Sequence, residues 1–124
     1  MKNHENMQEE TKRSNRNMRE RIWLSYDFGV NGDYEGIYQW LDDHGAVECG
    51  DSCASLLYER HGPRPLEDSL RTELKRVVQL RARDRIYLIS RTPQGKWIGR
   101  FIWGRRKAAA WAGYAAARGA IADE

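Results

Sequence analysis

Residues 22–28, IWLSYDF, carry apolar side chains at every second position: Ile22, Leu24, Tyr26 and Phe28 alternate with Trp23, Ser25 and Asp27. Because successive side chains of a strand point to opposite faces of a sheet, this alternation predicts a half-buried strand. Residues 29–32, GVNG, are typical of a loop. Beyond the loop, Asp33 precedes apolar residues at helical spacing, namely Tyr34, Ile37, Tyr38 and Leu41. We therefore expect Asp33 to cap a helix that ends at Gly45.

The rest of the chain continues to alternate between strand and helix patterns. Residues 46–59 have a strand pattern that is interrupted at residues 50–52, so they form either one bent strand or a tight hairpin. Pro65 is expected to begin a second helix, whose apolar stripe consists of Leu66, Leu70, Leu74, Val77 and Val78. Two more strands are predicted over residues 85–90 and 96–103, joined by a turn at residues 92–95.

This order of strands and helices predicts an α+β fold. Two helices that each carry one apolar stripe fit a two-layer sandwich of the ferredoxin-like type. In that arrangement both helices lie on one face of a mainly antiparallel sheet of four or five strands. A doubly wound α/β fold is disfavoured because two helices are too few to cover both faces of a sheet.

The chain has 124 residues, which is the size of one domain with polar ends. Residues 1–21 have only methionine as an apolar residue type, which predicts a disordered N-terminal arm. Residues 22–107 are predicted to form the folded domain, and residues 108–124 an alanine-rich tail or docking helix. The sequence has neither the roughly 18 consecutive apolar residues of a membrane span nor the apolar core of a signal peptide, so we expect a cytoplasmic protein without membrane contact.

The formal net charge of +3 conceals an uneven distribution along the chain. Residues 1–21 carry a net charge of +2, residues 22–59 carry −8 without a single Lys or Arg, and residues 60–124 carry +9. Phosphate affinity comes largely from Lys and Arg side chains that release condensed counterions. A polyanion is therefore expected to bind the last block, and a divalent cation the middle block.

Three short motifs carry a resemblance to a known group of proteins. They are residues 22–28, ending in Tyr-Asp-Phe, residues 44–46, His-Gly-Ala, and residues 50–54, Gly-Asp-Ser-Cys-Ala. Over residues 22–90 the chain resembles virulence-associated protein D and the small CRISPR-associated ferredoxin-like nucleases. The resemblance implies a ferredoxin-like fold, a homodimer paired through sheet edges, a defence or toxin-like role, and metal-dependent phosphodiester cleavage in some members. It also implies that Asp27 and Ser52 are the catalytic residues.

Asp27 and Asp33 are the candidate metal ligands. Asp27 lies at the end of the first predicted strand, and Asp33 follows in the next loop. Carboxylates and water molecules are the ligands that Mg²⁺ prefers, and a bound Mg²⁺ can activate water against a phosphodiester. In the alternative interpretation, Asp33 is only the helix cap and Asp27 accepts hydrogen bonds from loop amides.

The last block of the chain combines cations with aromatic residues. Its candidate nucleic-acid-binding residues are Lys96, Arg100, Arg105, Arg106, Lys107 and Trp103, interleaved with Trp97, Phe101 and Trp111. Cations hold phosphates and aromatic rings stack on bases, so this composition suits RNA or DNA. On a strand, Trp97, Phe101 and Trp103 share one face, whereas Ile98, Arg100 and Ile102 share the other. Alternatively, the aromatic residues belong to the core and residues 105–107 form a solvated basic run.

Four potential zinc ligands have a spacing that is tolerable for a zinc site but not diagnostic of one: His44, Cys49, Cys53 and His61. In the strand interpretation both cysteines are ordinary small core residues, and this interpretation is favoured over zinc binding.

The sequence as a whole predicts a small homodimeric protein associated with nucleic acid. If this protein is an enzyme, its predicted activity is that of a Mg²⁺-dependent endonuclease, in particular a ribonuclease. The alternative is a non-enzymatic binding or regulatory module for a protein, a nucleic acid or a nucleotide.

Overall fold

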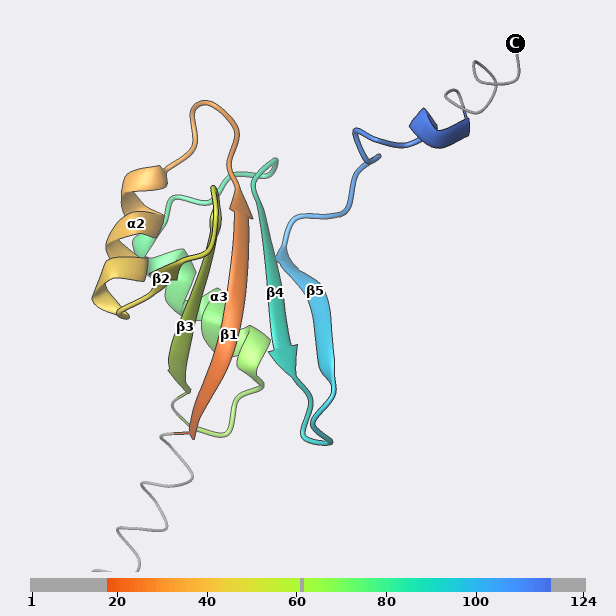
Figure 1. Cartoon of the computed structure of the whole chain (residues 1–124). Helices are drawn as coiled ribbons and strands as arrows, with labels where there is room; N and C mark the ends of the chain where they lie inside the picture. The colour runs from red at the N-terminus through yellow and green to blue at the C-terminus, as the bar shows by residue number, and fades with distance from the viewer. Residues whose placement is uncertain (1–17, 61, 117–124) are drawn as a thin grey trace, which may run out of the picture.

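The computed structural model describes residues 18–60 and 62–116, which contain one five-stranded sheet, two helices that pack on it and a short helical turn at residues 114–116 (Figure 1). The strands are β1 (Met18–Asp27), β2 (Val47–Glu48), β3 (Cys53–Arg60), β4 (Arg85–Arg91) and β5 (Trp97–Trp103). The helices are α2 (Tyr34–Asp43) and α3 (Leu66–Val77). Within the described part of the chain, no helix has the length and apolar character needed to cross a membrane.

The strands lie in the order β2-β3-β1-β4-β5, and all four neighbouring pairs are antiparallel. Both helices pack on the same face of this sheet, and the opposite face carries no helix (Figure 1). The predicted two-layer α+β sandwich is therefore confirmed. Strands β1 to β4 with the two helices follow the ferredoxin-like order, and β5 adds a strand at the edge of β4.

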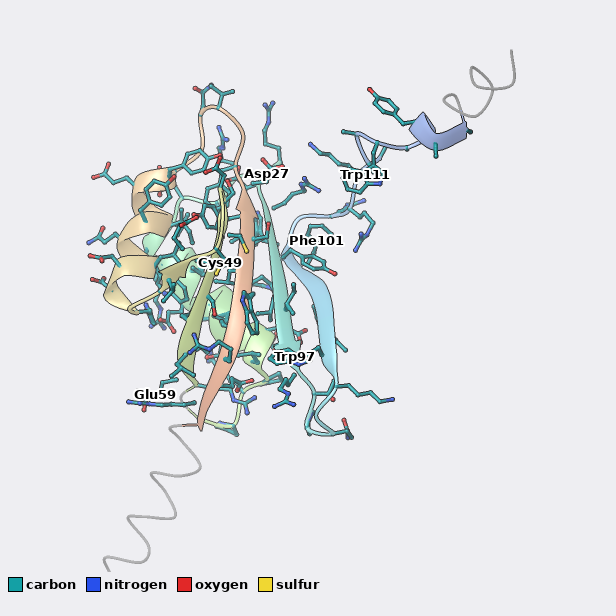
Figure 2. All side chains as sticks on the ribbon, viewed as in Figure 1. Asp27, Cys49, Glu59, Trp97, Phe101 and Trp111 are labelled. Carbon is teal, nitrogen blue, oxygen red and sulfur yellow. The ribbon has the colours of Figure 1, made fainter. Side chains whose placement is uncertain are left out.

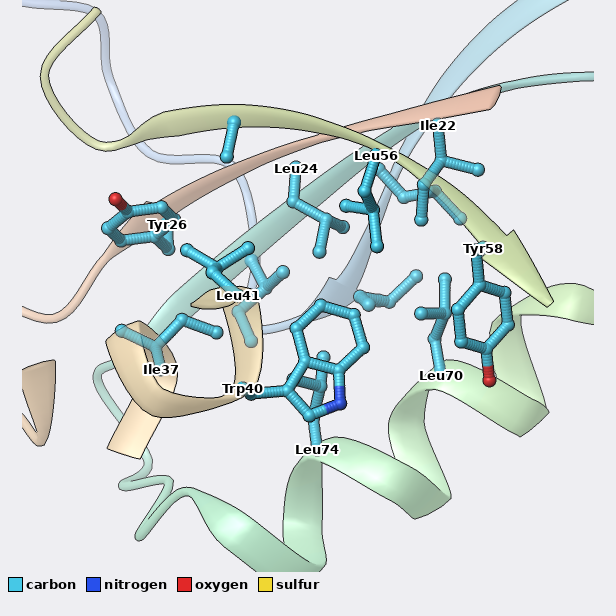
Figure 3. Close-up of a cluster of buried hydrophobic side chains, with 14 of the residues drawn as sticks. Ile22, Leu24, Tyr26, Ile37, Trp40, Leu41, Leu56, Tyr58, Leu70 and Leu74 are labelled. Atoms are coloured by element: carbon cyan, nitrogen blue, oxygen red, sulfur yellow. The ribbon is translucent and has the colours of Figure 1, made fainter. Parts of the chain in front are cut away.

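The core lies between the helices and the sheet (Figure 3). It contains the alternate residues of β1 that the sequence pattern predicted, together with the apolar stripes of both helices. Its fully buried members include Ile22, Leu24, Ile37, Leu56, Tyr58, Leu70, Leu74, Ile86 and Leu88. Burial of these side chains is the main stabilising contribution, at about 1.5–3 kcal/mol for each large apolar side chain.

The first strand begins at Met18, four residues before the predicted start of the domain at Ile22. Residues 18–21 pair with the far end of β3, where Arg21 lies opposite Leu57. These residues are held by backbone pairing and are too polar for a burial pattern to reveal them. Residues 1–17 of the predicted N-terminal arm lie outside the described residues.

Residues 46–59 form a hairpin and not a single bent strand. The two-residue strand β2 pairs with β3, and the chain turns sharply between them at residues 49–52. Ser52 adopts a positive φ of 64° in this turn, a conformation that is uncommon for residues other than glycine.

Asp33 caps α2, as predicted, and also joins the two helices. Its side chain accepts hydrogen bonds from the backbone N–H of Gly36 at 3.0 Å and of Gln79, just beyond α3, at 2.9 Å. These two amides hold the pKa of Asp33 below its usual value. A side chain at Gly36 would overlap both Asp33 and the carbonyl of Val77, so the close approach of the helices requires glycine at this position.

A polar network around Glu73 fastens α2 to α3 and to β3. The Glu73 carboxylate accepts hydrogen bonds from Trp40 Nε1 at 3.0 Å and from the Tyr58 hydroxyl at 2.8 Å. Its Oε1 atom also lies 2.8 Å from Nε2 of His44, whose ring stacks on Trp40. The network therefore satisfies polar groups at the periphery of an otherwise apolar core.

Candidate functional site

The face of the sheet that carries no helix has both aromatic and basic side chains. Along β4 this face carries Arg85, Tyr87 and Arg91, with the aliphatic Ile89 between them, and these residues alternate with core residues. Leu57, Ile89 and Trp97 on this face are 51%, 39% and 47% exposed. Figure 2 shows Trp97 and Phe101 on β5 and Asp27 at the end of β1. We call this surface the open face.

Four residues form the first cluster on the open face: Tyr87, Phe101, Arg85 and Arg106. The rings of Tyr87 and Phe101 meet edge to face, with their centroids 4.9 Å apart. The Arg106 guanidinium lies 5.8 Å from the Tyr87 ring and 5.5 Å from the Phe101 ring, and that of Arg85 lies 5.7 Å from Phe101. Together with Ser25 and Asp27 these residues line a shallow cavity of about 330 Å³. We call the four residues Tyr87, Phe101, Arg85 and Arg106 the Tyr87 cluster.

Gly99 on β5 explains how the Tyr87 ring is oriented. A side-chain carbon at Gly99 would overlap the hydroxyl group and the ring carbons of Tyr87. The Tyr87 ring therefore lies across β5 in the space that the missing side chain leaves. A ring that lies across the sheet in this way offers its outer surface to a ligand.

Asp27 contacts two cations, Arg85 and Lys107, at the end of the Tyr87 cluster. Its Oδ2 atom accepts a hydrogen bond from Arg85 Nη2 at 2.7 Å and lies 4.0 Å from Lys107 Nζ. The hydrogen bond from Arg85 is the main reason that the pKa of Asp27 lies below its usual value. Asp27 thus orients Arg85 against Phe101 in this chain.

A second aromatic group lies farther along the same strands. Trp23 of β1 and Trp97 of β5 meet edge to face with centroids 5.1 Å apart, and the Arg91 guanidinium lies 5.0 Å from the Trp97 ring. We call these three residues the Trp97 cluster. The open face thus repeats one combination, two aromatic rings with arginine, at two places.

The prediction that Trp103 shares a face with Trp97 and Phe101 is wrong. A register irregularity between Ile86 and Tyr87 shifts the end of β5, so that Trp103 lies opposite Ile86. Such a bulge turns the following side chain to the other face of the sheet. The Trp103 indole N–H donates to the Arg81 carbonyl at 2.9 Å, and its ring lies 5.2 Å from Lys75 of α3.

The six predicted nucleic-acid-binding residues do not form one surface. Arg100 lies on the helix side and forms an ion pair of 2.8 Å with Glu67 of α3. Lys96 closes the turn between β4 and β5, at the opposite end of β5 from residues 105–107. Of the predicted cations, Arg106 and Lys107 reach the Tyr87 cluster, and Arg105 is exposed beside them.

Asp27, Asp33 and Ser52 line three different cavities. Asp27 lines the cavity of the Tyr87 cluster, Ser52 one of about 410 Å³ beside α2 and β2, and Asp33 one of about 730 Å³ between α2 and α3. Within residues 18–60 and 62–116, no three His, Cys, Asp or Glu residues are grouped to hold a metal ion. Mg²⁺ binding by Asp27 and Asp33 therefore stays a prediction.

The predicted zinc ligands that the structure describes do not face one another as a zinc site. His44 contacts Glu73 and the Trp40 carbonyl, and Cys49 and Cys53 are free cysteines in the β2–β3 hairpin. His61 lies outside the described residues. The structure thus offers no assembled zinc site in the part of the chain that it describes.

The open-face residues of β4 were not among the predicted site residues. Arg85 and Tyr87 fall at alternate positions of the predicted strand 85–90, and Arg91 continues this alternation one residue beyond its predicted end. The strand alternation was therefore the signal that could have found them, since it places all three on the face opposite Ile86 and Leu88.

No family model, curated protein or solved structure matches this chain. The function of the protein is therefore inferred from its own residues and their arrangement.

Proposed function

We propose that this protein binds single-stranded nucleic acid on the open face of its sheet. The observation that carries the proposal is the Tyr87 cluster, in which two aromatic rings lie beside two arginine side chains on a surface without a helix. This proposal narrows the predicted association with nucleic acid to single strands. It also assigns the binding to a different set of residues.

The chemistry of the open face suits an unpaired strand. Every base has an aromatic surface that stacks on Tyr, Phe or Trp, and arginine holds the phosphates or stacks on the bases. In a duplex the bases are stacked on one another, so their surfaces are not available to the protein. An open sheet face on which partly exposed rings lie is therefore expected to select single strands.

The spacing of the two aromatic clusters suits an extended ligand. Tyr87 and Arg91 are four positions apart on β4, which corresponds to about 13 Å along the strand. An oligonucleotide that lies along β4 can therefore place one base at each cluster. Arg85 and Arg106 at one end and Arg91 at the other supply positive charge along this path.

The test is the binding of short fluorescent RNA and DNA oligonucleotides, single-stranded and duplex, across a salt series. Removing both rings, with Tyr87→Ala and Phe101→Ala, is expected to weaken single-strand binding about 5- to 150-fold for each base that no longer stacks. The matched control is Tyr38→Ala, which removes an exposed aromatic ring from the helix side and should leave binding unchanged.

A second pair of variants tests the cations. Arg106→Ala should weaken binding and reduce the dependence on salt by about 0.7 in the logarithmic slope, as expected for one lost phosphate contact with a single strand. Arg76→Ala removes an exposed cation from α3 and should change neither quantity. Equal losses in both variants, or equal affinity for duplex and single strand, would contradict the proposal.

The same samples test the predicted cleavage. Adding Mg²⁺ and running each sample on a gel detects any phosphodiester hydrolysis, and Asp27→Asn tests whether its carboxylate takes part. Binding without cleavage would leave a non-enzymatic module for nucleic acid.

A second copy of the chain or another protein could also cover the open face. Six cations, Arg19, Arg21, Arg85, Arg91, Arg106 and Lys107, lie on or beside it, so like charges oppose self-association there. Light scattering tests the predicted homodimer. A dimer that excludes oligonucleotide would overturn our assignment of this face.

A further inference from the structure

Cys49 and Cys53 lie directly opposite one another in the β2–β3 hairpin. The register pairs Val47 with Ser55 and Glu48 with Ala54, so the next pair in sequence is Cys49 with Cys53. The hydrogen bond from the Cys49 N–H to the Cys53 carbonyl, 2.9 Å long, confirms this alignment. The sequence alone could not establish the pairing, because it left open whether residues 46–59 bend or turn.

This position meets the backbone requirement of a disulfide. Directly opposite residues of an antiparallel pair have Cα atoms about 4.5–5.5 Å apart. Disulfides join residues whose Cα atoms are about 4.4–6.8 Å apart. Because side chains of opposite residues project to the same face of a hairpin, the two thiols share one side of it.

The two thiols differ in their access to solvent. Cys49 is exposed, whereas Cys53 is partly buried. Burial raises the pKa of the Cys53 thiol above its usual value, and the neighbouring Cys49 raises it further. Its exposure marks Cys49 as the thiol that a reagent meets first.

We propose that Cys49 and Cys53 form a reversible intramolecular disulfide by exchange with a small-molecule disulfide such as oxidised glutathione. The Cys49 thiolate attacks one sulfur of the oxidant, whose S–S bond breaks and releases one thiolate. The Cys53 thiolate then attacks the Cys49 sulfur of this mixed disulfide and releases the second thiolate. Two electrons pass to the oxidant, and the two thiol protons pass through solvent to the released thiolates.

The experiment treats the whole protein with oxidised glutathione and follows its intact mass. The expected product is lighter by two hydrogen atoms, carries no glutathione, no longer reacts with a thiol-alkylating reagent, and regains both thiols with dithiothreitol. A product that retains glutathione on wild-type protein, or a cross-linked dimer on a non-reducing gel, would overturn the proposal.

Two kinds of variant test whether the pairing of Cys49 with Cys53 in the hairpin is what allows the disulfide to form. Cys49→Ser and Cys53→Ser should each be unable to lose two hydrogen atoms and can form only a mixed disulfide. The matched control combines Cys49→Ser with Glu48→Cys, which moves the first thiol by one residue to the opposite face of the hairpin. If this control closes a disulfide as readily as the wild type, the register argument fails.

The result does not depend on oligonucleotide binding. Exchange is read from mass and thiol content, so it can succeed or fail whatever the outcome for the open face.

Discussion

The two faces of this sheet are built from alternate residues of the same strands, yet they have different chemistry. On β4, Leu88 faces the helices and is fully buried, whereas the adjacent Ile89 faces the other way and is 39% exposed. The helix side of β1 carries Leu24 and Tyr26, and its open side carries Trp23 and Asp27. Aromatic residues thus lie on both faces, although only one face needs them for the core.

This difference separates two reasons for an aromatic residue in a small protein. A ring in the core contributes through the apolar area that it buries, and other apolar residues of similar volume can replace it. The rings of Tyr87 and Phe101 lie beside arginine and contribute little to the core. Their arrangement fits recognition of a ligand better than stabilisation of the fold.

The largest expected effect is a difference in the free energy of unfolding between substitutions on the two faces. Leu88→Ala removes a fully buried side chain and should lower the free energy of unfolding by about 2–5 kcal/mol. Ile89→Ala, one residue along the same strand, should cost about 1 kcal/mol or less because its side chain is already partly in water. Urea denaturation followed by circular dichroism measures both. Equal losses would mean that the open face is covered in solution.

The next effect concerns the polar network that fastens the helix layer. Glu73→Gln keeps the shape of the side chain but removes the charge that accepts from Trp40 and Tyr58 and pairs with His44. We expect a loss of about 1.5–3 kcal/mol in the free energy of unfolding, with unchanged oligonucleotide binding. Thermal denaturation and the binding assay test the two parts. A variant that binds less while its stability is intact would place part of the site on the helix side.

A third variant perturbs the open face without removing any ring. Gly99→Val forces the Tyr87 ring to move, because a side chain at this position overlaps it. Valine is well suited to a strand, so stability should change little. We expect about tenfold weaker binding of single-stranded oligonucleotide, measured by fluorescence anisotropy. Serine at the same position also places a Cβ atom against the ring and should weaken binding as well.

The smallest effect is a dependence on pH at the helix junction. The pKa of Asp33 is lowered in the folded protein, so its stabilising contribution is present above about pH 3.9 and is lost as the pH falls through the folded pKa. At neutral pH, Asp33→Asn should therefore unfold more easily by about 1 kcal/mol or less. The difference from the wild type should shrink in acid. Urea titrations at pH 7 and pH 3 measure it, and a constant difference would assign the effect to something other than the charge.

Local patterns in the sequence were sufficient to predict most of the fold. The alternation in residues 22–28 and the stripe that includes Leu70 and Leu74 each reflect a single buried face, which one element reveals by itself. The start of β1 at Met18 could not be predicted in this way. Its first residues are polar and depend on pairing with β3, which begins 35 residues later in the chain.

The candidate site was harder to predict because it is assembled across strands. Arg85 reaches Asp27 only because β1 and β4 are neighbours in a particular register, and these residues are 58 positions apart. Trp103 was assigned to the wrong face because a single irregularity in β5 reverses the alternation that follows it. Neither the contact between Asp27 and Arg85 nor the irregularity in β5 can be recognised in a local sequence pattern.

The position of β1 in the sheet has a consequence for how the chain folds. Trp23 pairs with Ser55 on one side and with Ile89 on the other, partners that lie 32 and 66 residues later. Contacts between residues so far apart in sequence slow folding, since a long loop must close before they form. During synthesis β1 is made before either of its partners. The strand at the centre of the finished sheet is thus the one whose second backbone edge stays unpaired longest, which leaves the nascent chain open to aggregation until β4 has emerged from the ribosome.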